Sequence, residues 1–489
     1  MLRASAILLS LFLANAPAGV QPGTGTVYDR VILNGRVMDP RSGLDAQRNL
    51  GISGGRIAIV TSARIVGRDT IDARGLVVAP GFVDLHAHGQ NDESFRYYAM
   101  DGVTTALELE TGAGAVSRFY AERAGKARVN FGTAAGHFWA RRVATGETLA
   151  NYDDDRWSDT LSKWSHSPTT PALLTAVRTE LARALDEGAL GIGLGVAYVP
   201  GASRYEILDV FGMCAARTVM CFTHVRTGFE GLQEVLTDAM MTGAMLHVVH
   251  INSSSAASQG DPNAFNYLRA IHAARARGVD VSTEAYPYTA SSTTLQSALY
   301  DAALTTPGYD FGRIVWVATG EHLTRDTFIK YRKVGGTIVN LGGPDSLLAP
   351  IFRDSIVMVA SDAVPFVQHR GHPRMAGTFA RVLGRYSREQ KMMPLMEALR
   401  RMTIMPAQRL ERWVPQMRTK GRIGVGMDAD VVVFDAARII DRATVENPAQ
   451  YSAGIVHVLV GGASVVRAEA LVEGAFPGKG IRRALVNGR

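Results

Sequence analysis

Cysteine is scarce in this chain of 489 residues, and long apolar runs are absent. The only two cysteines, Cys214 and Cys221, fall in an expected helix and the strand after it, so a disulfide between them is possible but not implied. No apolar stretch reaches the roughly 20 residues that span a bilayer. No run of lysine and arginine alternates with aromatic residues as a nucleic-acid surface would. These absences argue against a membrane-spanning segment and a nucleic-acid surface, and the composition is that of a globular protein.

The first residues differ in composition from the rest of the chain. Arg3 precedes a short apolar run over residues 6–13, and the small residues that follow resemble a signal-peptidase site. We expect a signal peptide over residues 1–18, with cleavage after Ala18 and export to the periplasm or the medium; an uncleaved membrane anchor is the alternative. The formal net charge of +7 is scattered, which suits solubility and a preference for anionic substrates.

Both ends of the remaining chain have the sequence pattern of short antiparallel strands. Residues 27–78 alternate β-branched runs with turn dipeptides such as Asn34-Gly35, which is typical of hairpins. Similar runs return over residues 418–489, for example at 429–435 and 455–460. The simplest arrangement is one small β-sandwich that is built from both ends of the chain, with everything between them inserted as a single domain.

Between residues 79 and 410, strand-like runs alternate with helix-like segments such as 173–187 and 262–277, which favours a mainly parallel sheet. Eight such strands can be counted, the number in an α/β fold of the (β/α)8 TIM-barrel type. That fold places its chemistry at the carboxyl ends of the strands. The polar residues expected at these ends are His86, His88, Glu108, Glu110, His137, Tyr198, His224, His250, Tyr286 and Asp362.

The first of these strand ends, residues 79–89, organises the rest. Side chains two apart on a strand point the same way, so His86 and His88 project together. Two histidines that bond to each other without a metal are the alternative for this pair alone. Joined by His224, His250 and a carboxylate, however, they can hold one or two divalent ions and leave a position for water. Asp362 is placed to orient that water and to carry its proton, which indicates hydrolysis of an amide or ester.

Several stretches resemble the amidohydrolase superfamily and, within it, the N-acyl-D-amino-acid deacylases (D-aminoacylases). They are residues 80–88, 102–105, 188–191, 223–226, 286–290, 361–362, 372–384, 402–407, 421–423, 429–435 and 447–448. The resemblance implies a barrel with a flanking β-sandwich and zinc as the usual metal. It implies metal ligation by His86, His88, His224 and His250, and a role as general base and acid for Asp362, within reach of the metal.

The same resemblance implies how the substrate is held. Arg374 matches the group that pairs with the substrate's α-carboxylate, with Tyr286 as its helper. His137 and Arg141 resemble a stretch that lines the mouth of the site. A lysine that helps to bind the carboxylate in the deacylases is replaced by Asn252 in this chain. That replacement weakens the case for a free α-carboxylate and admits other amides.

Two further departures concern the metal. Many relatives bridge two metals with a carbamylated lysine on the fourth strand, but the chain has no lysine from residue 164 to 329. D-aminoacylases carry a cysteine after the second strand, and here Thr111 occupies its column, beside Glu110. Our hypothesis is that Glu110 supplies the bridging or metal-binding oxygen. Glu108 is the rival ligand, and a buried salt bridge is the third possibility.

The sequence thus favours an exported, metal-dependent hydrolase of amide carbon–nitrogen bonds that acts on N-acyl amino acids, of D configuration if the resemblance holds. A dipeptidase or a cyclic-amide hydrolase of the hydantoinase or dihydroorotase kind is the enzymatic alternative. A non-catalytic protein that only holds metal is the alternative from another class, and the presence of both Asp362 and the histidine set argues against it.

Overall fold

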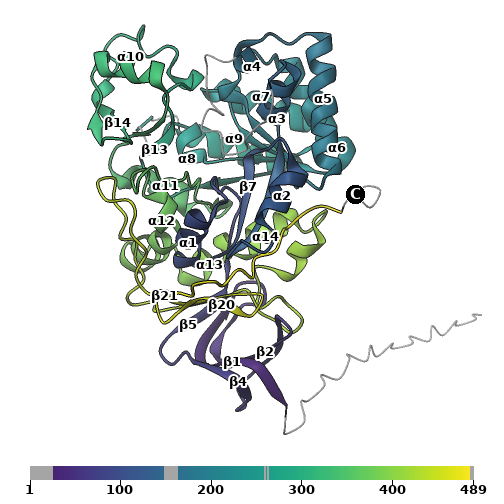
Figure 1. The fold of residues 1–489 in the computed structure, drawn as a ribbon, viewed down its shortest axis with the longest axis vertical. Helices are drawn as coiled ribbons and strands as arrows, with labels where there is room; N and C mark the ends of the chain where they lie inside the picture. The colour runs from purple at the N-terminus through teal and green to yellow at the C-terminus, as the bar shows by residue number, and fades with distance from the viewer. Residues whose placement is uncertain (1–25, 148–162, 258–259, 262–263, 485–489) are drawn as a thin grey trace, which may run out of the picture.

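The computed structural model describes residues 26–147, 163–257, 260–261 and 264–484. The expected signal peptide lies outside the described residues. A barrel surrounded by helices forms the body of the molecule, and a β-sheet domain made from the two ends of the described chain lies against one end of it (Figure 1). Among the helices described, none has the length and apolar character needed to cross a membrane.

Eight parallel strands form the barrel sheet, in the order β17-β12-β11-β10-β9-β8-β7-β6. Every β7, β8, β9 and β12 residue is buried, as expected for strands that are covered by helices outside and by side chains within. The predicted fold class is confirmed. The strands are β6 (Phe82–Asp84), β7 (Val103–Ala113), β8 (Asn130–Gly136), β9 (Gly191–Gly195), β10 (Met220–His224), β11 (Met245–Val248), β12 (Val281–Ala285) and β17 (Val357–Val359).

Side-chain hydrogen bonds join the two end strands of this sheet, β6 and β17. The buried Asp84 carboxylate accepts hydrogen bonds from the backbone N–H of Ser361, at 3.1 Å, and from the Ser361 hydroxyl. An isolated parallel bridge between Ala87 and Ala363 extends the seam. Burial raises the pKa of Asp84 to about 7. Because of this seam, the chain after β6 and the chain after β17 leave the barrel side by side.

Helices follow most barrel strands and carry ordinary start signals. Thr170 caps α5 by accepting from the Leu173 N–H, and Ser203 caps α6 in the same way. The helices predicted at 173–187 and 262–277 are observed as α5 and α9. The helices are α1 (Asp92–Met100), α2 (Val116–Arg123), α3 (His137–Ala144), α4 (Lys163–His166), α5 (Pro171–Asp186), α6 (Arg204–Arg217), α7 (Phe229–Thr242), α8 (Ile251–Ser254), α9 (Ala264–Ala276), α10 (Arg325–Val334), α11 (Ala349–Arg353), α12 (Arg374–Arg381), α13 (Leu395–Met402) and α14 (Ile404–Leu410).

The β domain is one nine-stranded sheet in which segments from the two ends of the described chain pair directly. The junction is the antiparallel pair β5 and β18, where Val78 lies opposite Val433. The strands are β1 (Val27–Asp39), β2 (Leu44–Ser53), β3 (Arg56–Thr61), β4 (Val66–Asp72), β5 (Val77–Pro80), β18 (Val431–Phe434), β19 (Ile455–Val460), β20 (Ala463–Arg467) and β21 (Ala470–Leu471).

The apolar run before His86, expected as one strand, is two strands that belong to different sheets. β5 ends at Pro80 in the β domain, and β6 begins at Phe82 in the barrel. Gly81 between them passes so close to β7 that a Cβ atom there would lie 2.2 Å from the Cγ2 of Thr104. Only glycine allows this approach, so the connection between the two domains passes directly into β6, the strand that precedes His86 and His88.

A small antiparallel sheet, which the sequence analysis did not anticipate, is inserted between β12 and β17 (Figure 1). Its strands are β13 (Ser291–Thr294), β14 (Ile314–Trp316), β15 (Glu321–His322) and β16 (Thr337–Asn340), in the order β13-β16-β14-β15. Helix α10 packs on it, and Ile314, Phe328 and Ile338 belong to its own apolar core. We call residues 291–340 the insertion.

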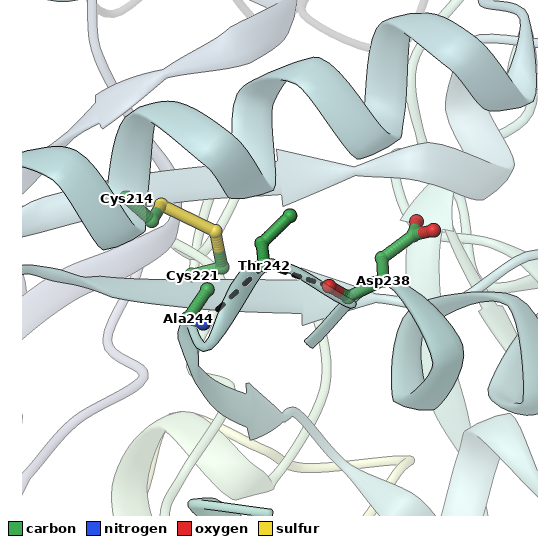
Figure 2. Close-up of a disulfide and its surroundings, with 5 residues drawn as sticks. All are labelled: Cys214, Cys221, Asp238, Thr242 and Ala244. Atoms are coloured by element: carbon green, nitrogen blue, oxygen red, sulfur yellow. Dashed lines mark hydrogen bonds between the residues drawn. A yellow bond between two sulfur atoms is a disulfide. The ribbon is translucent and has the colours of Figure 1, made fainter. Parts of the chain in front are cut away.

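The two cysteines form a disulfide that links α6 to β10 (Figure 2). The Cα atoms of Cys214 and Cys221 are 6.2 Å apart, within the usual range for a bridge. The disulfide therefore ties α6 to the strand that ends at His224. The sequence alone did not decide whether this bridge forms.

We expect Gly81→Ala to destabilise the protein by about 1–3 kcal/mol, because the added methyl group overlaps the buried Thr104 side chain. The measurement is the free energy of unfolding in urea. The matched control is Gly212→Ala, in the middle of α6, where a Cβ meets no atom within 4 Å. That change should be neutral or stabilise by up to about 1 kcal/mol. Equal stability of the two variants would contradict the close approach at Gly81.

Candidate metal centre

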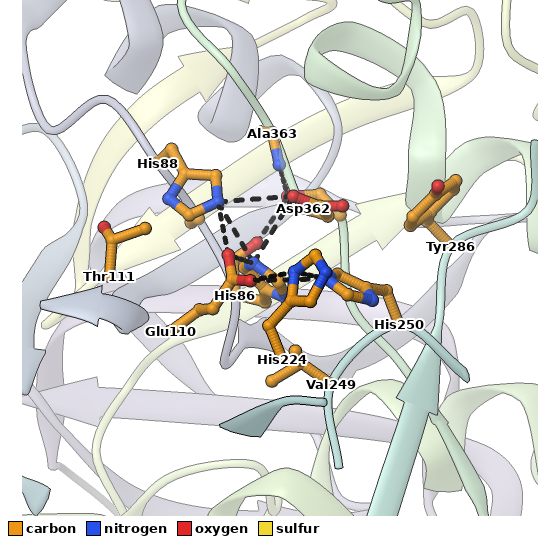
Figure 3. A network of polar contacts seen from close by, with 12 residues as sticks. His86, His88, Glu110, Thr111, His224, Val249, His250, Tyr286, Asp362 and Ala363 are labelled. Carbon is orange, nitrogen blue, oxygen red and sulfur yellow. Dashed lines mark hydrogen bonds and ion pairs between the residues drawn. The ribbon is translucent and has the colours of Figure 1, made fainter. Parts of the chain in front are cut away.

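Six side chains from five strands converge at the carboxyl end of the barrel (Figure 3). His86 and His88 follow β6, Glu110 lies in β7, His224 ends β10, His250 follows β11 and Asp362 follows β17. The two end strands are neighbours because of the Asp84–Ser361 seam, which brings Asp362 beside the histidines of the first strand. Six of the ten predicted strand-end residues are therefore brought together in one place.

Glu110 lies at the middle of this group. Its Oε2 is 2.9 Å from the Nε2 of His86 and 3.2 Å from the Nε2 of His88. Its Oε1 is 2.7 Å from the Nδ1 of His224 and 3.3 Å from the Nε2 of His250. One carboxylate thus faces two pairs of imidazoles, one pair with each oxygen. Although burial opposes ionisation, the histidines hold the pKa of Glu110 well below its usual range.

The side chains divide into two possible ligand groups that share Glu110. The first consists of His86, His88, Glu110 and Asp362, and the second of Glu110, His224 and His250; within each group the ligand atoms all lie within 4.8 Å of one another. The Oδ1 of Asp362 completes the first group, at 3.3 Å from the Nε2 of His86 and 3.2 Å from the Nε2 of His88. This division agrees with the hypothesis that Glu110 bridges two metal ions. The binding of metal by these groups stays a prediction.

The donor set fits divalent metal ions such as zinc. The Nε2 atoms of His86 and His88 are 3.1 Å apart, and the Nδ1 of His224 is 3.0 Å from the Nε2 of His250. Two ring nitrogens at such a distance must have a proton or a cation between them, because two unprotonated ring nitrogens would repel each other through their lone pairs. Imidazole nitrogen and carboxylate oxygen are the ligands that zinc takes in catalytic sites.

Carboxylates on the far side of two histidines select the nitrogen that faces this centre. The Nδ1 of His86 is 2.6 Å from Glu284, and the Nδ1 of His88 is 2.7 Å from Glu108. Both rings therefore present Nε2 to Glu110. Glu108 also accepts from the backbone N–H of Thr111, at 3.1 Å. Glu108, the rival ligand in the sequence analysis, belongs to neither ligand group and orients His88 instead.

A cavity of about 700 Å³ opens onto the metal centre. Its inner end is formed by His88, Glu110, His224, His250 and Asp362. The outer walls are aromatic and polar, and the insertion supplies part of them, including Ser291, Ser292, Thr293, Tyr300, Tyr309 and Asn340. A cavity of this size suits a small molecule, so the insertion helps to decide which substrates enter.

Arg374 and Tyr286 both line this cavity, as predicted for substrate-binding residues. The Nη1 of Arg374 is 2.8 Å from the Oδ2 of Asp362, and its guanidinium carbon lies 4.6 Å from the centre of the Tyr286 ring. Burial opposes ionisation of Asp362, but Arg374 and His86 outweigh it and hold the pKa of this carboxyl well below its usual range. Asp362 is therefore an ionised carboxylate.

His137 and Arg141 do not line the cavity, contrary to the expectation from the resemblance. Both are fully buried and bond to Glu206 of α6: the His137 Nε2 lies at 2.7 Å, and the Arg141 Nη1 reaches both carboxylate oxygens at 2.6 and 2.8 Å. Burial of the Arg141 guanidinium without a partner would be costly. Glu206 therefore links these two side chains of α3 to α6 and holds them outside the cavity lining.

Asn252 also lies outside the lining of the cavity. Its side chain is fully buried, accepts from the Tyr286 N–H and donates to the Tyr288 carbonyl, each at 3.4 Å. The residue that replaces the deacylases' lysine therefore supports the backbone of the turn after β12.

Sequence reasoning gave no role to Glu284 or Tyr198. The Tyr198 ring contacts the His224 ring edge-on, with centroids 4.8 Å apart, and lines the cavity. Its position just after the fourth expected strand was the available signal. For Glu284 the signal was a carboxylate inside an otherwise uncharged strand, β12.

Comparison with known proteins supports the reading from geometry. The profile of the amidohydrolase family matches residues 69–298 and 353–466, and the unmatched gap contains most of the insertion. An N-acyl-D-glutamate deacylase of Alcaligenes xylosoxydans xylosoxydans is 31% identical over 481 residues, which cover 89% of this chain and 93% of that protein.

Two solved structures are similar over nearly the whole chain. An N-acyl-D-glutamate deacylase of Bordetella bronchiseptica, complexed with zinc and a phosphonate inhibitor, has a TM-score of 0.77 at 28% identity and covers 94% of this chain and 100% of its own. A D-aminoacylase, studied for its binuclear metal centre, has a TM-score of 0.76 at 25% identity, covering 93% and 100%. On these matches the chain belongs to the amidohydrolase family, and it is a hydrolase of amide carbon–nitrogen bonds.

Proposed function

We propose that this amidohydrolase is a zinc-dependent deacylase of N-acyl-D-amino acids. The observation that carries the proposal is the position of Glu110 between four imidazoles, with the ionised Asp362 at the edge of the same group and Arg374 beside it. The similarity to a D-glutamate deacylase over most of both chains supports the acyl amino acid as substrate, and the zinc in the solved relative supports the metal.

The metal would be held by the two ligand groups that share Glu110. When bound there, it would polarise the amide carbonyl and make water a stronger acid. The protein fixes where the metal would be held, because Glu284 and Glu108 orient the rings of His86 and His88.

Asp362 is the residue that moves the proton. Its Oδ1 faces the Nε2 atoms of His86 and His88, and its Oδ2 is held by Arg374. A carboxylate in this position can accept a proton from the attacking water and deliver it to the departing nitrogen. The low pKa of Asp362 keeps it in the accepting form at neutral pH.

Arg374 is the group suited to hold the substrate's α-carboxylate. It is 1% exposed, it lines the cavity, and its Nε has no hydrogen-bond partner in the described part of the chain. A buried donor of this kind is costly unless a ligand satisfies it. A substrate carboxylate would supply that acceptor, next to the aromatic face of Tyr286.

Zinc-loaded protein should release free amine from N-acyl-D-amino acids and not, at comparable rates, from N-acyl-L-amino acids, dipeptides or a hydantoin. Chelation should abolish turnover, and added zinc should restore it. Amine release is measured with a primary-amine reagent, and hydantoin opening by its absorbance. Faster cleavage of dipeptides or of the hydantoin would replace the deacylase proposal by that activity, and turnover that survives complete removal of metal would refute the metal dependence.

Asp362→Asn should lower kcat by about 10²- to 10⁴-fold, because the amide cannot take up the proton. The control is Asp354→Asn, at the opposite end of β17, where the carboxylate bonds to His272 at 2.7 Å. This control should keep its rate within about twofold. Unchanged turnover in Asp362→Asn would remove Asp362 from the mechanism.

We also propose that the protein is exported with removal of residues 1–18. The apolar run followed by small residues supports this, and the Cys214–Cys221 disulfide suits an oxidising compartment. Expressed in a Gram-negative host, the protein should appear in the periplasmic fraction with Gly19 as its first residue, determined by mass spectrometry. Leu9→Arg, which interrupts the apolar run, should retain it in the cytoplasm. An intact N-terminus in the periplasm would contradict cleavage.

A further inference from the structure

Glu284 is a buried carboxylate with an unusual set of partners. It lies in β12 and is 1% exposed. Among the described residues its ion-pair partners are two histidines and no lysine or arginine: the Oε1 lies 2.6 Å from the Nδ1 of His86, and the Oε2 lies 3.0 Å from the Nε2 of His247. A carboxylate so placed is costly unless both oxygens accept hydrogen bonds, so both rings must donate to it.

His247, the second histidine that contacts Glu284, has a defined partner on its other ring nitrogen. The Nδ1 of His247 lies 2.7 Å from the hydroxyl of Ser282, which stands two residues before Glu284 on the same face of β12. A serine hydroxyl can donate to that nitrogen, so His247 can remain neutral and still donate from Nε2. A continuous series of contacts runs from Ser282 through His247 and Glu284 to His86.

The near end of the series faces the metal centre. With its Nδ1 proton bonded to Glu284, the His86 ring presents the Nε2 lone pair to Glu110, at 2.9 Å, and to Asp362, at 3.3 Å. Had the proton been on Nε2, this nitrogen could not bind a metal. The corresponding contact in the second ligand group is weaker, because the Nδ1 of His250 meets only the neutral hydroxyl of Ser254, at 3.1 Å.

We propose that Glu284 is a positioning residue that fixes the metal-binding nitrogen of His86 and so sets the affinity of the first ligand group, while leaving the second group unaffected. The proposal rests on the proposed zinc dependence. It assigns Glu284 no contact with substrate, because Glu284 is absent from the lining of the cavity.

The test is a competition titration of metal-free protein with zinc and a chromophoric chelator, which resolves the two binding steps. In Glu284→Gln, the dissociation constant of one step should rise about 10- to 100-fold and that of the other should stay within about twofold. Glu284→Asp, which keeps the negative charge on a side chain one methylene shorter, should weaken the same step by less. Thermal unfolding of each metal-free variant reports its stability without the contribution of bound zinc.

The matched control is Glu206→Gln, another fully buried carboxylate that bonds to a histidine but lies outside the metal centre. It should lower stability without changing either zinc step. If both Glu284 variants bind zinc as the wild type does, the inference is overturned and the proposed function stands. If the wild type binds no zinc, both fall together. A uniform loss of both steps in Glu284→Gln and Glu284→Asp would show a structural role and overturn the positioning role.

Discussion

A single carboxylate between four imidazoles is the interaction on which the rest of the site depends. Glu110 can face both histidine pairs only if the first, second, fifth and sixth strands of the barrel end at the same level. The parallel barrel provides that condition, since it places the carboxyl ends of all its strands around one opening. The negative charge on Glu110 in turn attracts the ring protons or the cation that must lie between it and the four imidazoles, because unprotonated ring nitrogens and carboxylate oxygens repel one another.

The second constraint is the junction at which the barrel closes. Asp84 and Ser361 join the first and last strands, and the residues that follow them, His86 and Asp362, come into contact as a result. Gly81 lies just before this junction. Because it has no side chain, the chain that comes from the β domain can pass close to Thr104 of the packed strand β7. The position of the Asp362 carboxylate relative to the histidines therefore depends on two contacts in the barrel wall, the Asp84–Ser361 hydrogen bonds and the close approach at Gly81.

The strands and most of the site could be predicted from sequence, because a polar residue that ends an apolar run is a local signal. His224, His250 and Asp362 were found in this way. What could not be predicted depends on long-range partners. Glu206 lies far along the chain from His137 and Arg141, and its contacts with both side chains hold them outside the cavity. The insertion has strands too short for a reliable pattern, and the role of Glu284 depends on which ring of another strand lies opposite it.

The charges of the cavity bear on how binding and catalysis are connected. Two arginines line it, and Arg226 is already neutralised by the buried Glu234, at 3.0 Å. Arg374 is paired with Asp362, the carboxylate to which we assign the proton transfer in the proposed function. With Asn252 turned into the protein, no lysine adds a second cation there. In the proposed function, recognition of the substrate carboxylate and the ionisation of Asp362 depend on the same guanidinium, so a substitution at Arg374 would alter substrate affinity and proton transfer together.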